Sequence, residues 1–412
     1  MGDNDSRAGA SRPISASWSR RRFLRAAGIT AGAVGLAPVL AACGSDSGST
    51  GFAADPSGIV DFANWSLYVD RAKDANGVRY SPSLRSFTAK TGIEVNYREV
   101  IQDAAGFFEQ IQSYLAAGEP TGWDIIVMTN GATLTKMINL GYLEELPSDL
   151  RPNFDRNASE AVRDPAYDPG NRFSMAWQSG ITGLAYNPKV TGRRITSVRD
   201  LFDPAFAGKV GMFGDSLDLP NFALLAVGAD PETSTPDDWK NAADLLVKQR
   251  KDGLVRDYYL QNYVNPLSRG DLAVSMAWSG DVFQENLSGA ADGLQFVVPE
   301  EGALLWTDAM CVPKGALHPA DAITYMDFVY RPDIAADIAS WVNYITPVPA
   351  AQQVLLERAD ADASENGEFL RDVAGSELVF PTDDTVDRLR TYRVLDDAEE
   401  VEWNRLFSSF YS

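Results

Sequence analysis

Residues 304–313 read Leu-Leu-Trp-Thr-Asp-Ala-Met-Cys-Val-Pro, a mostly apolar run that contains one aromatic ring and one carboxylate two positions apart. In a β-strand, residues i and i+2 point to the same face, so Trp306 and Asp308 would present a ring and a negative charge side by side. An ammonium group is attracted to both, and its methylenes can lie against the indole. This stretch therefore predicts a strand that holds a small organic cation. The alternative is a core tryptophan beside an aspartate in a loop.

Three other stretches combine rings, hydroxyls and acids in a similar way. They are Asn64-Trp65-Ser66-Leu67-Tyr68, Asp215-Ser216-Leu217-Asp218 and Trp278-Ser279-Gly280-Asp281. One such combination is weak evidence for a binding site, and its recurrence along the chain strengthens that interpretation.

Strand and helix patterns alternate around these stretches. Near-continuous apolar runs are typical of buried parallel strands, and apolar residues at helical spacing predict helices. The repeated strand-helix-strand order calls for a parallel sheet with helices on both faces, and such sheets bind ligands beyond the carboxyl ends of their strands. Trp65, Tyr68 and Thr129 fall at such ends. The first part of the chain is expected to contain strands 59–63, 93–97 and 123–128 and helices 81–89, 104–117 and 133–140.

A second strand-and-helix unit follows a long loop at 147–171. Residues 173–185 can form a strand that crosses into this unit, and residues 307–312 with the helices after them return to the first. A chain of 412 residues is too long for one ordinary core, so two domains agree with its length. Within the second unit we expect strands 209–213, 272–278 and 294–298 and helices 219–228 and 236–251.

The chain is strongly acidic. From residue 43 onward it carries 30 basic and 55 acidic residues, a net charge of −25, because six arginines and only two aspartates lie before that point. Such a surface repels nucleic acid and anionic lipid headgroups and attracts cations. Solubility outside the cell is the simpler explanation for most of this charge.

Cysteine and histidine are scarce. The two cysteines, Cys43 and Cys311, imply no disulfide framework, and Cys311 is expected to be a buried, inert thiol. The only histidine, His318, lies before Pro319 in a polar connection. No Cys/His zinc cluster can be assembled, and a Ser/His/Asp triad would have to use this one imidazole. We therefore expect no metal and no cofactor.

The first 42 residues have the pattern of an export signal. Residues 19–25, Ser-Arg-Arg-Arg-Phe-Leu-Arg, precede an uncharged run of small and apolar residues that is short for a membrane span. The twin arginine resembles a Tat signal, and Leu40-Ala41-Ala42-Cys43 resembles a bacterial lipobox in which Cys43 becomes the lipidated first residue. Residues 43–58 are then expected to form a flexible tether. The alternative, an unprocessed anchor helix, disagrees with the length of the run and its glycines and proline.

Several further blocks follow one another in a characteristic order. They are 62–69 (Phe-Ala-Asn-Trp-Ser-Leu-Tyr-Val), 276–280 (Met-Ala-Trp-Ser-Gly), 299–302 (Pro-Glu-Glu-Gly) with Trp306-Thr307-Asp308, 330–333 (Tyr-Arg-Pro-Asp) and 344–347 (Tyr-Ile-Thr-Pro). The series resembles the spermidine/putrescine-binding proteins of bacterial ABC importers, the PotD/PotF type. The resemblance implies an α/β, two-lobed periplasmic-binding-protein fold of type II, with mostly parallel sheets flanked by helices and a ligand cleft between the lobes. Lobe 1 would comprise 59–175 plus 307–345, and lobe 2 would comprise 176–306 plus 346–412.

The resemblance also implies a set of ligand contacts. Rings would enclose a methylene chain, carboxylates would hold ammonium groups, and hydroxyls would accept the remaining N–H donors. Asp218 could instead cap the following helix, Asp215 could be a turn residue, and Trp65 and Tyr344 could be hinge packing. The implied contacts are Trp65, Ser66, Tyr68, Thr129, Asp215, Asp218, Trp278, Trp306, Asp308 and Tyr344.

This sequence departs from the family pattern in three places. Gly131 stands where the family has a tyrosine, which would leave one wall of the site more open, and Asp218 replaces a longer glutamate. A late glutamine of the family has no match within 382–393. These departures leave the choice of polyamine open.

The resemblance implies a lipid-anchored binding protein that closes over a polyamine and delivers it to a membrane permease. We expect a monomer that is held at the outer face of the cytoplasmic membrane and binds no nucleic acid. One alternative is the same scaffold with another small cationic amine; an anionic ligand would need Arg or Lys, and the matched positions contain none. The other is a secreted hydrolase that uses Asp215 and Asp218 as acid and base, although two carboxylates three residues apart at a helix start lie close together.

The lipobox generates a prediction about localisation. Changing Cys43 to Ala should release the protein from the membrane or block its processing, because no thiol remains at the lipobox position to carry the lipid. Cell fractionation with mass spectrometry of the mature N-terminus is the measurement. A Cys43→Ala protein that still fractionates with the membrane in a processed, lipid-bearing form would contradict the assignment.

Overall fold

The computed structural model describes residue 52 and residues 56–260, 262–287 and 293–411. The expected export signal, Cys43 and most of the expected tether lie outside the described residues. Residues 49–412 are one compact unit. Among the described residues, no helix is long and apolar enough to span a membrane.

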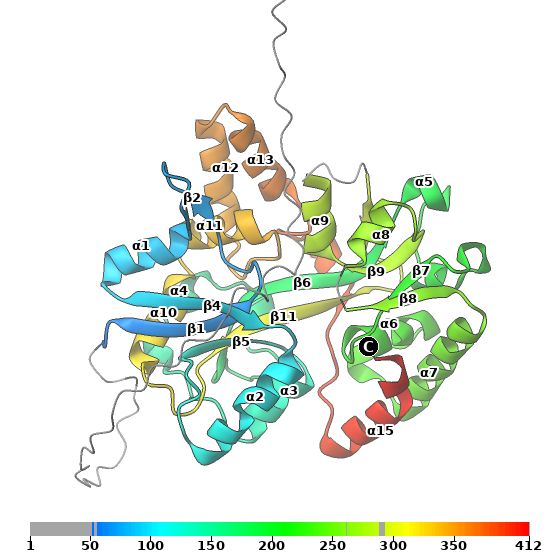
Figure 1. Cartoon of the computed structure of the whole chain (residues 1–412), viewed down its shortest axis with the longest axis horizontal. Coiled ribbons are helices and arrows are strands. Elements are labelled where there is room, and N and C mark those ends of the chain that lie inside the picture. The colour runs from blue at the N-terminus through cyan, green and yellow to red at the C-terminus, as the bar shows by residue number, and fades with distance from the viewer. Residues whose placement is uncertain (1–51, 53–55, 261, 288–292, 412) are drawn as a thin grey trace, which may run out of the picture. The chain divides into compact units, whose positions relative to one another are not determined.

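A ten-stranded mixed sheet runs through this unit in the order β4-β1-β5-β11-β6-β9-β7-β8 (Figure 1). β10 adds to β6, and β12 adds to β11. The small β2 (Ala72–Lys73) and β3 (Arg79–Tyr80) form a separate ladder. The strands of the main sheet are β1 (Ile59–Trp65), β4 (Glu94–Ile101), β5 (Ile125–Thr129), β6 (Ser174–Tyr186), β7 (Val210–Phe213), β8 (Val255–Tyr259), β9 (Val274–Trp278), β10 (Gln295–Val297), β11 (Ala303–Cys311) and β12 (Leu389–Arg390).

The two long strands, β6 and β11, join the halves of the sheet. They pair antiparallel with each other; residues 308–311 of β11 also pair with β5, and residues 182–186 of β6 also pair with β9. The ladders on either side, β4-β1-β5 and β9-β7-β8, are parallel. β6 and β11 lie at the segments where the crossing (173–185) and the return (307–312) were expected. The expected parallel ladders are joined into one continuous sheet, because the crossing strands are long enough to pair on both sides.

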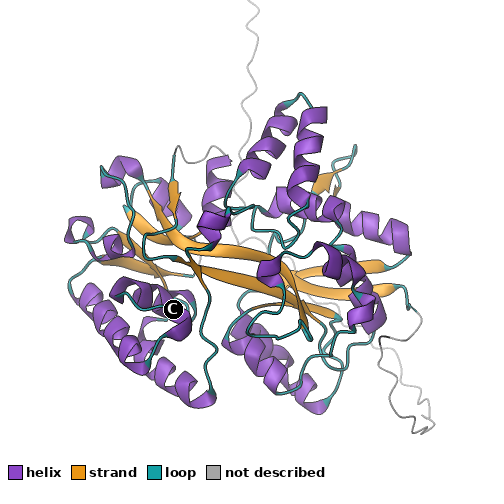
Figure 2. Ribbon diagram, turned by 180° about the vertical axis from the view of Figure 1, so that it is seen from behind, coloured by secondary structure: helices purple, strands orange, loops and turns teal. Residues whose placement is uncertain are grey.

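Helices cover both faces of this sheet (Figure 2). Local caps explain several of their boundaries: Asp103 caps the start of α2, and Gly118 ends it with a left-handed backbone conformation. The expected loop at 147–171 contains α4 and two short 3-10 helices. The helices are α1 (Pro82–Thr91), α2 (Ala104–Ala117), α3 (Ala132–Asn139), α4 (Pro152–Asn157), α5 (Pro188–Thr191), α6 (Asp218–Val227), α7 (Pro236–Lys251), α8 (Val264–Ser268), α9 (Ser279–Leu287), α10 (Pro319–Phe328), α11 (Pro332–Val342), α12 (Ala351–Ala361), α13 (Glu365–Gly375), α14 (Asp383–Val386) and α15 (Asp397–Phe407).

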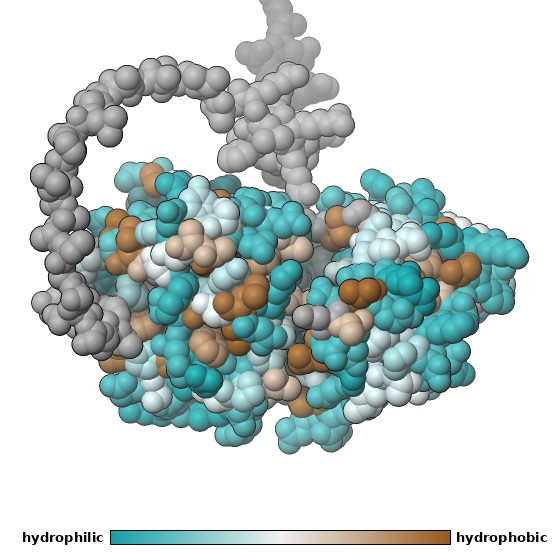
Figure 3. Space-filling model, turned by 90° about the horizontal axis from the view of Figure 1, so that it is seen from below, coloured by the Kyte–Doolittle hydropathy of each residue, from teal (hydrophilic) through white to brown (hydrophobic). Residues whose placement is uncertain are grey.

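Hydrophobic cores define two lobes. In the first lobe, Phe62 packs in a core on one face of β1, and Ala63 packs in a second core on the other face beneath α2 and α3. This is the pattern of a parallel sheet that is buried on both sides. The second lobe has its own core around Phe213 and Trp239. The surface around these cores is mainly hydrophilic, with apolar residues in scattered patches (Figure 3).

The packing differs from the expected division at residue 346. Residues from Val348 to Val379 lie in the core of the first lobe, and Tyr392 to Phe410 lie in the core of the second. The physical reason is that α12 packs against α11 and α13, so these three helices stay together as one layer. Only the last segment of the chain continues into the second lobe.

Candidate functional site

β11 presents the predicted ring and carboxylate together. Trp306 and Asp308 are only 9% and 6% exposed, and both belong to the strand, so the alternative of a loop aspartate is wrong. Trp306 lies over its register partner Gly180 on β6. A Cβ atom at Gly180 would be 2.1 Å from Cζ2 of the indole, so only glycine allows this close approach.

Asp308 lies on β11, the middle strand of three, and has no cationic partner among the described residues. Its register neighbours are Thr129 on β5 and Gln178 on β6. Thr129 Oγ1 donates a hydrogen bond to Asp308 Oδ1 at 2.5 Å. Burial raises the pKa of Asp308 to about 6, and the hydrogen bond from the Thr129 hydroxyl only partly offsets this effect. The Tyr68 hydroxyl is close by, and burial followed by the charge of Asp308 raises its pKa well above the usual value.

Tyr344 connects this centre to the second lobe. Its ring lies 5.2 Å from the Trp306 ring and 6.0 Å from the Tyr68 ring, measured between centroids in edge-on pairs. Its hydroxyl donates to Asp281 Oδ1 at 3.2 Å, and the Tyr263 hydroxyl donates to the other oxygen at 2.9 Å. Burial raises the pKa of Asp281 as well.

A second acidic centre lies at the start of α6. The buried Asp218 accepts hydrogen bonds from Thr182 Oγ1 at 2.9 Å, Trp278 Nε1 at 2.9 Å and the Tyr392 hydroxyl at 2.6 Å. Burial is the main cause that raises the pKa of Asp218. These donors come from segments far apart in the chain: Thr182 is on β6, and Tyr392 is near the C-terminus.

Asp215 holds the backbone of this helix start. Its Oδ1 accepts from the N–H groups of Leu217 at 2.8 Å and Asp218 at 2.5 Å. The alternative that Asp218 caps the helix is therefore wrong, and Asp215 is the turn residue. Burial, and then the charge of Asp218, raises the pKa of Asp215 to about 7.

The four carboxylates form an acidic site whose negative charge is not balanced by a positively charged side chain of the described residues. Among the described residues, none of Asp215, Asp218, Asp281 and Asp308 makes an ion pair with Lys or Arg, or with the histidine. Three buried oxygens nearby, Asp215 Oδ2, Gln178 Oε1 and the Tyr68 hydroxyl oxygen, also have no hydrogen-bond partner within the described parts of the chain. Buried carboxylates without a partner are costly unless they bind protons or a cation. The arrangement therefore favours a ligand that supplies positive charge and N–H donors.

The structure brings most of the predicted residues together. Trp65 is half-buried at the end of β1 and packs against both cores of the first lobe. Ser66 lies apart from the other predicted residues, because its side chain is exposed in the turn after β1 and bonds to none of the other site residues that the structure describes. The residues brought together are Tyr68, Thr129, Asp308, Trp306 and Tyr344 around β11, and Asp215, Asp218 and Trp278 around α6.

Sequence reasoning missed three groups in the site. Asp281 had a signal, since it follows Trp278 by three residues just as Asp218 follows Asp215. Tyr392 lies in the segment in which no late contact was found, and nothing in its local sequence marks it. Thr182 is one of several hydroxyl residues along β6 and has no distinguishing pattern.

Leu217 closes the wall that was expected to be open. Gly131 has φ 141°, and a Cβ atom there would lie 3.1 Å from Leu217 Cδ1. Gly131 begins α3 in the first lobe, and Leu217 precedes α6 in the second. The space that a side chain at residue 131 would occupy is therefore filled by Leu217 from the opposite lobe.

Comparisons with known proteins agree with this geometry. Residues 123–366 match the family described as bacterial extracellular solute-binding protein. The chain is 25% identical over 336 residues to the spermidine/putrescine-binding periplasmic protein of Escherichia coli (strain K12), covering 79% of this chain and 90% of that protein. It is 29% identical over 348 residues to the putrescine-binding periplasmic protein PotF of the same organism, covering 80% and 88%.

The fold has a close counterpart among solved structures. The substrate-binding protein PotD of a spermidine/putrescine ABC transporter from Streptococcus pneumoniae superimposes with a TM-score of 0.69 at 21% identity, covering 86% of this chain and 98% of that chain. The expected two-lobed α/β periplasmic-binding-protein fold is confirmed.

The raised pKa of Asp308 predicts a pH-dependent stability difference. In the folded protein, burial raises this pKa from 3.8 to about 6. Between pH 4 and pH 6, the folded protein therefore keeps a proton on Asp308 that the unfolded chain has released. The stability contributed by that proton is fully present below the unfolded pKa and is lost as pH rises through the folded pKa. Asp308→Asn has no charge to bury. Its free energy of unfolding should exceed that of the parent by up to about 3 kcal/mol above pH 7, and the gain should shrink toward pH 4.

Urea denaturation of ligand-free parent and variant between pH 4 and pH 8 is the measurement. Asp149→Asn is the matched control, because it removes the same charge at an exposed residue in a short 3-10 helix, and its effect should be small at every pH. An Asp308→Asn difference that stays constant across this range would contradict the prediction.

Proposed function

Because this chain belongs to the bacterial extracellular solute-binding proteins, we propose that it captures a polyamine, spermidine or putrescine, between its lobes and delivers it to a membrane ABC permease. The observation that carries the proposal is a set of four carboxylates, Asp218 and Asp308 buried and Asp215 and Asp281 partly buried, with no Lys or Arg partner among the described residues. A linear polyamine is a chain of methylenes with ammonium groups at its ends. It supplies what this site lacks.

The arrangement of charge suits a ligand with more than one ammonium group. Asp308 lies on β11 at the junction with the first lobe, and Asp215 and Asp218 lie at the start of α6 in the second. The Trp306 ring, two residues from Asp308 on β11, packs against the Tyr344 ring, and both offer apolar surface to methylenes. Relatives named for spermidine or putrescine binding support this ligand class.

Simple energetics assign most of the affinity to charge. Burying four methylenes at about 0.8 kcal/mol each contributes about 3 kcal/mol, whereas a micromolar Kd requires about 8 kcal/mol. Ammonium–carboxylate pairs and cation–π contacts supply the difference, and both strengthen when water is excluded. Asp308 is buried beside the Trp306 ring, and its carboxylate has fewer hydrogen-bond donors than that of Asp218, so Asp308 should matter most.

Closure of the lobes completes the site. The first lobe comprises 59–175 plus 307–345, and the second comprises 176–306 plus 346–412, with one change. Residues 348–379 belong with the first lobe, because they pack in its core. The contact between Gly131 and Leu217 is one place where the lobes meet. The ligand-bound, closed form is the one that the permease would recognise. Export, a lipid anchor on Cys43 and a monomeric state complete this proposal.

The hydrolase alternative has less support from the geometry. Both oxygens of Asp218 accept hydrogen bonds from side chains, and Asp215 is occupied with the backbone of its own turn. Such bonds fix the two carboxylates for binding. They do not place them on opposite sides of a scissile bond, as acid and base catalysis requires.

Two substitutions separate the role of charge from the role of the ring. Asp308→Asn keeps the volume and one acceptor oxygen but loses the charge, so polyamine binding should weaken by about 2–5 kcal/mol. Trp306→Leu keeps apolar surface but loses the ring, so binding should weaken by about 0.5–2 kcal/mol. Titration calorimetry of both variants with putrescine and spermidine is the measurement, and circular dichroism checks the fold.

Asp149→Asn serves again as the control for net charge and should bind as the parent does. A thermal-shift panel of putrescine, cadaverine, spermidine, spermine, amino acids and sugars identifies the ligand class first. Protein that responds to sugars or anions and to no amine would overturn the proposed function. Asp308→Asn protein that binds every polyamine as tightly as the parent would remove Asp308 from the site.

A further inference from the structure

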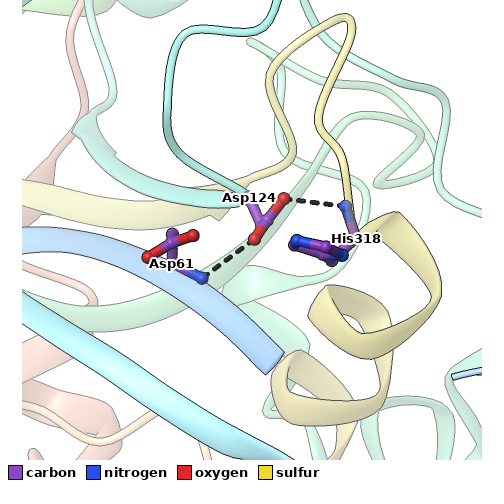
Figure 4. Close-up of side chains that lie close together, drawn as sticks. All are labelled: Asp61, Asp124 and His318. Carbon is purple, nitrogen blue, oxygen red and sulfur yellow. Dashed lines mark hydrogen bonds between the residues drawn. The ribbon is translucent and has the colours of Figure 1, made fainter. Parts of the chain in front are cut away.

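A second group of polar side chains lies at the opposite ends of the same strands. Asp61 is on β1, Asp124 directly precedes β5, and His318 directly precedes α10 (Figure 4). The candidate amine site uses the carboxyl ends of β1 and β5, whereas this group lies toward their amino ends. One ligating atom from each of the three residues lies within 4.8 Å of the other two.

Backbone hydrogen bonds orient the central carboxylate. Asp124 is 2% exposed; its Oδ2 accepts from the Asp61 N–H at 2.9 Å, and its Oδ1 accepts from the His318 N–H at 2.8 Å (Figure 4). Each of these oxygens keeps a second lone pair. Asp61 Oδ1 accepts from Asn96 Nδ2 at 3.0 Å, which leaves Asp61 Oδ2 available.

A chain of hydrogen bonds selects the tautomer of His318. Ser57 Oγ donates its only proton to Asp321 Oδ2 at 2.6 Å and lies 2.7 Å from His318 Nδ1. Nδ1 must therefore carry a proton and donate it to Ser57. In the neutral ring the lone pair is then on Nε2, and that end of the ring points toward the two carboxylates (Figure 4). Metal-binding histidines are held in the same way, with the non-ligating N–H fixed by an oxygen.

A lone pair that faces two carboxylates is repelled unless a proton or a metal cation lies between them. Among the described residues, no Lys or Arg makes an ion pair with Asp61 or Asp124. We propose that Asp61, Asp124 and His318 bind a divalent transition-metal ion, with Zn²⁺ as the representative case. One imidazole and two carboxylates suit such an ion, and the half-exposed position of Asp61 and His318 leaves room for water as a further ligand.

The three side chains would move closer together on binding. Ligand atoms that share a tetrahedral zinc ion at about 2.0–2.2 Å lie about 3.4 Å apart, which is less than the present limit of 4.8 Å. The expectation of no metal rested on the counts of Cys and His, and those counts exclude only zinc sites built from these residues. The carboxylates of the proposed site come from segments far apart in the chain. Bound metal would fix the loop before α10 against β1. This contact lies next to Ser57, two residues before β1 begins.

Metal titration of untagged, chelator-treated and dialysed protein tests the proposal. Zn²⁺ should bind in a 1:1 ratio by calorimetry and raise the melting temperature of the parent by a few degrees. Asp61→Asn and His318→Gln should each weaken Zn²⁺ binding by about 100-fold or more, and Asp149→Asn should leave it unchanged. Two variants are used because His318→Gln also alters the contact with Ser57, whereas Asp61→Asn does not.

The outcomes are distinct from those of the amine site. Polyamine binding should be the same in Asp61→Asn and the parent, so failure of one proposal leaves the other standing. Absence of 1:1 Zn²⁺ binding by the parent would overturn the metal site. Zn²⁺ binding that persists at parental affinity in Asp61→Asn and His318→Gln would show an adventitious ion elsewhere on this acidic surface and would overturn it as well.

Discussion

The rest of the structure depends on carboxylates that are buried without counter-charges at the junction of two lobes. Removing a carboxylate from water costs several kcal/mol unless something pairs with it, and this region holds two buried carboxylates, Asp218 and Asp308, and two partly buried ones, Asp215 and Asp281. The fold meets part of the cost with hydroxyl and indole donors, as around Asp218, and part by holding protons, as the raised pKa values of Asp215 and Asp308 indicate. The rest of this desolvation cost can be offset only by positive charge. A cationic ligand supplies that charge, and the pairing contributes to its affinity.

The long crossing strands explain why this demand can be coupled to motion. β6 and β11 belong to the ladders of both lobes, so residues along them face both sides of the junction. Asp308 bonds to Thr129 in the first lobe, while Thr182 on β6 bonds to Asp218 in the second. Separation of the lobes would expose these carboxylates to water. Binding of a cation would favour the closed arrangement, because only there do all the groups reach the same ligand.

Much of the fold could be predicted from sequence, because its signals are local. The bounds of α2 follow from the Asp103 cap and Gly118, and the strand at β5 follows from its apolar run. The continuous sheet could not be predicted, since pairing of β11 with both neighbours depends on contacts far apart in the chain. The same holds for the layer formed by α11, α12 and α13, whose apolar faces indicate burial without indicating which lobe buries them.

The candidate site divides in the same way. Trp306 and Asp308 were predicted from strand periodicity, and the structure places them as expected on one face of β11. Tyr392 was missed because its role arises from the meeting of segments that the sequence does not connect. Asp281 stood in the stretch 278–281 but was not taken as a ligand contact, because its bonds to Tyr263 and Tyr344 join distant segments.

The central claim is that a cationic ligand replaces protons on these buried carboxylates. Calorimetry of putrescine binding in buffers with different ionisation enthalpies measures this directly, because it counts the protons exchanged on binding. At pH 6 the account predicts net release of protons, since Asp308 and Asp215 are partly protonated before the ammonium groups arrive, and release should fade by pH 8. Proton uptake, or the same exchange at both pH values, would contradict it.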